Sequence, residues 1–534
     1  MLIKRLILPI CLTVTLAIQA QDSLLLRDYT FMKYSDPWLN SPNAAALTRF
    51  ASQNIAQAEL SLSGEKGGFT NYNGSDDATL LNANVESFYR YNQRTVFFGS
   101  MSYKNFSGRH MAGSAFINPE RKPFDLVEDS LTNEGTKHRD TYNLIGGFGC
   151  QITPKLAIGA KMDYTAANMA KYKDLRHQNK LMDLQLTASV YAPVTSWLNL
   201  GAYYQHHRNT ESIIFGKYGT SDKVYKTLIS YANFTGHLEQ FGQEGYTDKS
   251  REMPFVDNSN GGGIQFSFHD SQTFLYTDFT YAQGWGYYGP KSPYTITYSN
   301  HNSEKYRWQI SFIDKSSKTA VYRVDMCFSH QKLQNDATTY RELKNASGAT
   351  YYDYYTPVKN ADRIWQDFSI GYTIHAGIRQ AIPTWTIHAS IAWMERQQTA
   401  YIFPFYRRQT LYSYSPSFSL CHNIIAKRGI WSFTLNGSYL KGEGKPYEDF
   451  VFQKPSDKQP VPPSMDAYLY REYQWLTASQ FCIGGQAKYA FVWPNTRIKT
   501  FARLALSHRK ANESYEYSNG QNRTEATLAI GCEF

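Results

Sequence analysis

Apolar and polar residues alternate along most of this 534-residue chain, from about residue 55 to its end. In one such run, Trp385, Ile387, Ala389, Ile391 and Trp393 are separated by polar or small residues. A period of two is typical of a β-strand with one apolar and one polar face. The runs are about 10 to 14 residues long, whereas strands of soluble domains usually have about 5–6. Because about 9–11 tilted residues cross a bilayer, the pattern predicts membrane-spanning strands.

The connections between these strands alternate in length. Short turns alternate with long polar connections, as periplasmic turns and extracellular loops do in outer-membrane barrels. Eight short turns with both termini on their side require nine hairpins. We therefore predict an all-β fold, a closed transmembrane antiparallel β-barrel of about 18 strands (16–20). The turns are expected at 92–94, 153–155, 193–196, 270–272, 314–317, 377–383, 426–428 and 492–496.

Closure has a physical reason, since an open sheet in lipid would leave the backbone groups of its edges unpaired. The main alternative is a soluble protein of many strands, such as a sandwich, propeller or β-helix. The sequence contains no clear repeat of 20–50 residues, which argues against a propeller.

The C-terminus carries a motif of its own. Leu528, Ile530 and Phe534 alternate with smaller or polar residues, and the chain ends on the aromatic residue. In this respect the chain resembles bacterial outer-membrane β-barrels. The resemblance implies that the last strand is a signal for the barrel assembly machinery.

The chain divides into three predicted parts. Residues 1–20 have the positive start, apolar stretch and small-residue end of an export signal. Residues 21–54 form an N-terminal segment that lies in the periplasm or plugs the lumen, and residues 55–534 form the barrel. The protein is therefore expected in the outer membrane.

Charged residues of both signs fall on the polar faces of the predicted strands. A charge facing lipid near the midplane costs about 2–4 kcal/mol, so these side chains are expected to face the lumen. Two interpretations remain open, a charge network that holds the strands in register and a substrate site. The candidates are Lys161, Asp163, Asp183, Asp278, Arg307, Arg323, Asp325, Asp367, Lys499 and Arg503.

Two segments could fill a lumen of this width: Asp22–Asn54 and the long connection Asn209–Asn260. Within the first, the run Asp36–Leu47 resembles the Asn-Pro-Ala-rich start of fatty-acid-type outer-membrane transporters. That resemblance implies an N-terminal plug and passage of hydrophobic ligands. The predicted strand number exceeds the 14 strands of that family.

Motifs for other chemistry are weak. Gly284–Gly289 fits G-x-G-x-x-G, but Pro290 and Pro293 follow, so no helix would present amides to a phosphate. The sequence predicts no enzyme, no cofactor and no bound metal. It also lacks a visible basic groove or helix for nucleic acid.

The net charge of +10 has a simpler explanation. Lys and Arg in the loops would pair with phosphates of lipopolysaccharide in the outer leaflet. The Tyr-rich stretches 292–298, 351–355 and 401–414, predicted as loops, could stack on sugars or bury against a partner, or could simply be abundant tyrosine.

The start Ala20-Gln21-Asp22, the Tyr/Asn-rich loops and Phe534 together resemble uncharacterised outer-membrane barrels of Bacteroides-type bacteria. The resemblance implies a role beside nutrient-uptake machinery, with surface lipoproteins or an uptake receptor as partners. No TonB-dependent plug domain is visible, which argues against energy-coupled transport by this chain alone. Three hypotheses remain: a channel or accessory component of nutrient uptake, a plugged barrel that docks surface proteins, and a hydrophobic-substrate transporter.

Overall fold

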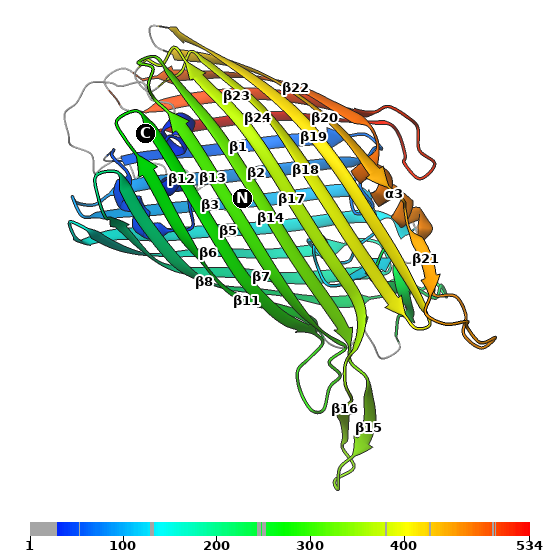
Figure 1. Ribbon diagram of the computed structural model, residues 1–534. Helices are drawn as coiled ribbons and strands as arrows, with labels where there is room; N and C mark the ends of the chain where they lie inside the picture. The colour runs from blue at the N-terminus through cyan, green and yellow to red at the C-terminus, as the bar shows by residue number, and fades with distance from the viewer. Residues whose placement is uncertain are drawn as a thin grey trace, which may run out of the picture.

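The computed structural model describes residues 29–52, 54–128, 133–242, 247, 252–379, 382–426, 429–493, 496 and 498–534. The predicted export signal, residues 1–20, lies outside these residues. Eighteen antiparallel strands form one closed barrel, which confirms the predicted fold (Figure 1). The strands are β1 (Asn54–Lys66), β2 (Asp77–Arg90), β3 (Thr95–Met111), β5 (Gly135–Thr153), β6 (Leu156–Lys171), β7 (Arg176–Pro193), β8 (Leu198–Gly216), β11 (Met253–His269), β12 (Thr273–Tyr288), β13 (Ser299–Asp314), β14 (Ala320–Ala337), β17 (Val358–Ala376), β18 (Trp385–Ile402), β19 (Phe405–Ala426), β20 (Gly429–Gly444), β22 (Gln480–Val492), β23 (Lys499–Ala511) and β24 (Asn522–Glu533).

The barrel closes between its first and last strands. Strand β1 pairs with β24 from Gln57 opposite Glu533 to Lys66 opposite Thr524. The backbone of Phe534 extends this seam through two hydrogen bonds with Ala56. Because every wall strand has a partner on both sides, the wall has no free edge in the bilayer.

The outer face of the wall is apolar, as the alternation predicts. Leu60 and Leu62 of β1 and Leu528 and Ile530 of β24 are exposed on one face, while Ser61 and Ser63 are buried on the other. Exposed Tyr and Trp side chains accompany them, as expected at the two membrane interfaces. None of the helices among the described residues has the length and apolar character needed to span a bilayer.

The strands are longer than the predicted 10 to 14 residues. They range from 12 residues in β24 to 22 in β19. At their extracellular ends, where the long loops begin, neighbouring strands continue to pair. The sequence there is too polar to predict a membrane-spanning strand. For this reason the Tyr-rich stretch 401–414, predicted as a loop, is mostly the paired ends of β18 and β19. The short strand β21 (Glu448–Val451) also pairs with this end of β19.

The N-terminal segment packs on the inner face at the periplasmic end. It comprises α2 (Tyr29–Tyr34) and the short 3-10 helices η3 (Pro37–Asn40) and η4 (Ala44–Arg49). Helix η4 contacts β3, β5, β6 and β7. One apolar cluster joins the segment to Phe88 and Val96, which flank a periplasmic turn.

A second structure packs inside the extracellular end. The short strands β4 (Asp125–Glu128), β9 (Lys226–Ala232) and β10 (Thr235–Gln240) form a separate sheet, here called the inner sheet. Strand β4 comes from the connection between β3 and β5, and strands β9 and β10 come from the connection between β8 and β11. Part of the predicted connection Asn209–Asn260 therefore does fold inward. Helix α3 (Asp466–Thr477), which the alternation did not predict, packs beside it.

The inner sheet contacts two separate parts of the wall. One cluster joins Phe124 and Ile229 to Ile213, Phe255 and Tyr288 of the wall. Strand β9 also contacts β17 and β18 in another part of the wall. A hairpin of β15 (Tyr340–Lys344) and β16 (Thr350–Tyr354) projects from the barrel instead (Figure 1).

Candidate functional site

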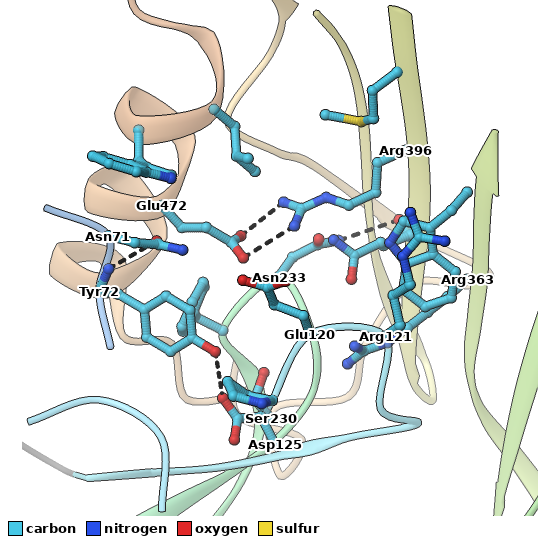
Figure 2. A pocket seen from close by; sticks show the side chains of 17 residues that line it. Asn71, Tyr72, Glu120, Arg121, Asp125, Ser230, Asn233, Arg363, Arg396 and Glu472 are labelled. Carbon is cyan, nitrogen blue, oxygen red and sulfur yellow. Dashed lines mark hydrogen bonds and ion pairs between the residues drawn. The ribbon is translucent and has the colours of Figure 1, made fainter. Parts of the chain in front are cut away.

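The inner sheet, α3 and the wall enclose a cavity of about 200 Å³ at the extracellular end. Its lining comes from segments far apart in the sequence (Figure 2). The β1–β2 loop contributes Tyr72, β4 contributes Asp125, and α3 contributes Glu472. Strands β17 and β18 contribute Arg363 and Arg396.

One ion pair ties α3 to the wall across this cavity. The Arg396 guanidinium donates two hydrogen bonds to the Glu472 carboxylate, at 3.0 and 2.7 Å, and a third to Gln409 at 2.8 Å. This two-point geometry is the strong form of an arginine–carboxylate contact. It positions the helix relative to β18.

A buried carboxyl lies on the side of the inner sheet. Tyr72 donates a hydrogen bond to Asp125 at 2.8 Å, and Ser114 donates another at 2.5 Å. Burial raises the pKa of Asp125, although both hydrogen bonds act in the opposite direction. Burial also raises the pKa of Tyr72, so its hydroxyl remains the donor.

Arg363 is the cationic side chain of the cavity with the fewest contacts. It is 7% exposed and donates one hydrogen bond of 2.6 Å to the Tyr231 carbonyl oxygen. Its buried Nε has no hydrogen-bond partner among the described residues, and neither has Oδ1 of Asn233, which also lines the cavity. Both atoms are polar groups that burial leaves unsatisfied.

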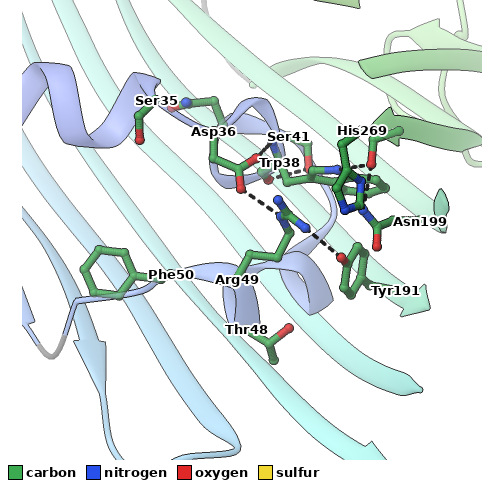
Figure 3. Close-up of polar contacts among 12 residues, drawn as sticks. Ser35, Asp36, Trp38, Ser41, Thr48, Arg49, Phe50, Tyr191, Asn199 and His269 are labelled. Atoms are coloured by element: carbon green, nitrogen blue, oxygen red, sulfur yellow. Dashed lines mark hydrogen bonds and ion pairs between the residues drawn. The ribbon is translucent and has the colours of Figure 1, made fainter. Parts of the chain in front are cut away.

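The N-terminal segment is held by a different kind of contact (Figure 3). Asp36 pairs with Arg49 at 2.7 Å within the segment, and Arg49 donates to the Tyr191 hydroxyl of β7 at 2.9 Å. The Trp38 indole is fully buried and donates to Ser267 of β11 at 3.0 Å. Further hydrogen bonds join residues 29–50 to β2, β7, β11 and β14, so the segment is held at many points of the wall.

Glycines of the wall make room for this segment. A Cβ at Gly159 would lie 2.3 Å from the backbone nitrogen of Ala45, and one at Gly149 would lie 2.6 Å from the Ala44 carbonyl oxygen. Only the missing side chains allow η4 to lie this close to β5 and β6.

The ten charges singled out in the sequence do not form one site. Among them, Arg323 and Asp325 form an ion pair at 2.6 Å, and Arg307 lies within electrostatic range of Asp278. Lys161 and Asp163 also interact electrostatically.

Six of the ten candidate charges contact partners that the sequence did not indicate. Their contacts are Asp163 with Asn143 at 2.7 Å, Asp183 with His207 at 2.9 Å, Asp278 with Tyr203 at 2.9 Å, Asp367 with Arg121 at 2.6 Å, Lys499 with Glu533 at 2.5 Å, and Arg503 with Glu59 at 2.5 Å. The contacts are distributed around the barrel, from the periplasmic end at Lys499 to the cavity rim at Asp367.

Sequence reasoning missed the residues of the cavity itself. Arg363 and Arg396 lie in strands, in phase with the polar face, but nothing marks them apart from other polar positions. Glu472 and Asp125 come from connections whose folding inside the barrel depends on tertiary packing. Among the described residues, no three His, Cys, Asp or Glu side chains gather where a metal ion could be held.

Residues 44–534 match the model of DUF6850, described as a family of unknown function. The chain belongs to this family. No curated protein matches the DUF6850 chain.

Several solved structures are similar to this DUF6850 protein. The ferric preacinetobactin receptor BauA of Acinetobacter baumannii is 7% identical with a TM-score of 0.41, covering 91% of this chain and 80% of its own. The RagAB peptide transporter is 7% identical with a TM-score of 0.41, covering 90% and 87%. A Pseudomonas aeruginosa FadL homologue is 10% identical with a TM-score of 0.30, covering 93% and 94%. Likenesses this weak carry no argument, so the fold rests on the strand pairing of the chain itself.

Proposed function

We propose that this DUF6850 protein is an outer-membrane barrel of nutrient uptake whose lumen is closed by two parts of its own chain. The observation that carries the proposal is the pair of internal structures at opposite ends. Residues 29–50 lie against the inner face at the periplasmic end. The inner sheet and α3 reach between facing parts of the wall at the extracellular end. A solute passes only when both have moved, which argues against a permanently open channel.

The two closures act in series, so removing either one alone should leave the other in place. The test compares single-channel conductance of four forms in a planar bilayer: the full chain, a deletion of residues 22–50, a variant with 226–240 replaced by a short Gly-Ser linker, and the double variant. We expect silence from the full chain, little current from each single variant and stable large currents from the double variant.

Each form must first be shown to be folded, by its heat-modifiable migration on a gel. Stable large currents from the folded full chain would refute the closed lumen. A folded double variant that stays silent would show that some other part of the chain closes the barrel.

The chemistry of the inner wall supports polar cargo. A cavity against the inner wall, between the two closures, is lined by polar side chains that include Ser417, Ser419, Asn436 and Gln486. The space beside the N-terminal segment combines apolar side chains such as Met32 and Phe50 with Asp36, Arg49 and Lys315. A path for hydrophobic substrates would need a continuous apolar surface, so we do not favour the fatty-acid type of transport.

A second candidate function has its own observation. The β15–β16 hairpin leaves the barrel and carries Tyr340, Tyr351, Tyr352 and Tyr354, two of them exposed. Such a surface suits docking of a surface lipoprotein or uptake receptor. Replacing 340–354 with a Gly-Gly linker should abolish co-purification of that partner and leave conductance unchanged. A partner that still co-purifies would exclude the hairpin as the docking site.

The remaining expectations stay part of the proposal. Residues 1–20 are the cleaved export signal, and residues 21–54 contribute the periplasmic plug. The ten lumen charges hold strands in register, and Leu528, Ile530 and Phe534 present the last strand to the assembly machinery. Basic loop residues contact lipopolysaccharide. No catalytic role is proposed.

A further inference from the structure

The cavity at the extracellular end contains a buried cation without a matching anion. Of its three arginines, Arg396 is paired with Glu472 and Arg121 with Asp367. Arg363 hydrogen-bonds to a carbonyl oxygen, and no carboxylate among the described residues reaches it within hydrogen-bond distance. A buried charge is costly unless a group of opposite charge and good geometry offsets it.

Three carboxyl groups line the cavity; Glu120 is exposed, and the other two are committed to other partners. Asp125 accepts hydrogen bonds from Tyr72 and Ser114, and Glu472 accepts both hydrogen bonds from Arg396. These groups attract Arg363 at longer range only. The Arg363 side chain thus lines a cavity of about 200 Å³ with a buried Nε that has no hydrogen-bond partner among the described residues.

A second unsatisfied atom in the cavity has the opposite character. Oδ1 of Asn233 is a buried acceptor without a donor, while Nδ2 of the same side chain donates to the Gln398 carbonyl oxygen at 3.2 Å. Asn233 lies in the turn between β9 and β10, facing the part of the wall that carries Arg363 (Figure 2). The cavity lining thus includes a cation and an amide that each keep one unsatisfied, buried polar atom.

Aromatic side chains complete the lining. Trp365 of β17 and Trp475 of α3 both border the cavity. Their rings supply flat apolar walls for the body of a ligand, while the arginine fork matches the two oxygens of a carboxylate.

We propose that this cavity binds a small polar solute that bears a carboxylate. The carboxylate accepts hydrogen bonds from the Arg363 guanidinium, and a hydroxyl or amino group of the solute donates to Asn233 Oδ1. The site goes beyond the closed lumen proposed above and is tested by binding, not by conductance, so the two proposals can fail separately.

The test is isothermal titration of the full-length protein in detergent with three probes. Acetate carries the carboxylate alone, D-gluconate adds hydroxyl groups, and sorbitol has the hydroxyl groups without the charge. We expect weak binding of acetate, tighter binding of gluconate and no binding of sorbitol.

Two variants assign the roles. Arg363→Gln should weaken gluconate binding by about tenfold or more, because it removes the charge and the two-point contact. Asn233→Gly suits the positive φ of 52° at this position, and it should reduce gluconate binding towards that of acetate without changing acetate binding. Arg408→Gln on β19, an exposed arginine outside the cavity, is the matched control and should bind like the unmodified protein.

Several results would overturn the proposal. If the folded protein bound neither acetate nor gluconate, the cavity would hold only water. If sorbitol bound as well as gluconate, the carboxylate would not be what is recognised. If Arg363→Gln bound gluconate unchanged while migrating as a folded barrel, the anion would lie elsewhere.

Discussion

The two structures inside the barrel, at its opposite ends, are built differently. The N-terminal segment leads into β1, contains no paired strand among residues 29–50, and is held to the wall by side-chain hydrogen bonds and apolar packing. The inner sheet is made of connections that return to the wall at both ends. It packs into two apolar clusters, as the N-terminal segment does, and buried ion pairs such as Lys171–Glu128 join it to the wall.

This difference separates what can move from what holds the barrel's shape. We expect the N-terminal segment to be the part that moves, because residues 29–50 contain no strand and its departure would break no strand pair. The inner sheet cannot leave without exposing Phe124, Leu126 and Ile229, each almost fully buried. We therefore expect the periplasmic closure to open first and the extracellular structure, which holds the cavity, to open only at a larger cost in free energy.

The largest expected effect tests this contrast in stability. Glu211 is fully buried, pairs with Lys122 at 3.1 Å and accepts hydrogen bonds from Asn179 and the Ile117 amide, both at 2.7 Å. Glu211→Ala leaves a buried lysine without its partner and should cost about 3–5 kcal/mol. Arg49→Ala, in the partly exposed pair of the N-terminal segment, should cost about 1 kcal/mol or less.

Both values can be read from urea unfolding followed by tryptophan fluorescence. Equal losses for the two variants would contradict the proposed contrast between the extracellular structure and the movable N-terminal segment.

A smaller loss of stability is expected from a substitution that releases only the N-terminal segment from the wall. Gly159→Ala places a methyl group against the backbone of Ala44 and Ala45, and such overpacking costs about 1–3 kcal/mol. The barrel should stay folded while residues 29–50 become sensitive to added protease. Gly146→Ala is the control, because its Cβ would meet nothing within 4 Å. Protection that stays unchanged in Gly159→Ala would show that this close approach does not hold the segment.

The smallest expected effect is that the stability of the inner sheet, and not that of the N-terminal segment, depends on pH. Because burial raises the pKa of Asp125, the folded state binds its proton more tightly than the unfolded state does. The stabilisation is complete below the ordinary pKa of 3.8 and is lost as the pH rises through the raised value. Amides of β4 and β9 should therefore exchange more slowly, after correction for intrinsic rates, on the acid side of this window.

Asp125→Asn, which keeps the shape of the side chain, should remove that dependence. Amides of the N-terminal segment should show none in either form. A dependence that survives the substitution would mean that another group titrates.

The wall of the barrel could be predicted because its physics is local. Each wall residue, such as Leu528 or Ser61, faces either the lipid or the lumen. The alternation of apolar and polar residues in the sequence shows which of the two it faces. All eight expected turns fall between consecutive wall strands, which is why the strand number was right. Strand length was underestimated because pairing continues beyond the bilayer, where an outward face no longer has to be apolar.

The interior could be predicted only in part. The two filling segments were identified from their position and length, but their contacts were not. Arg363 and Asn233 lie 130 residues apart and meet only because the connection after β8 folds across the lumen. Of the ten charges predicted to face the lumen, most contact residues such as Glu59, His207 or Glu533, whose positions depend on register between strands.

The seam between β1 and β24 sets an order of events during biogenesis. Phe534, next to β24, pairs with Ala56 near the start of the barrel, so the wall cannot close until β24 has been made and exported. Residues 29–50 emerge before any wall strand. At the moment of closure they must already lie on the inner side of the growing sheet, or else enter through the periplasmic mouth afterwards. In the folded protein, residues 29–50, which are made before the wall strands, therefore lie inside the barrel that those strands form.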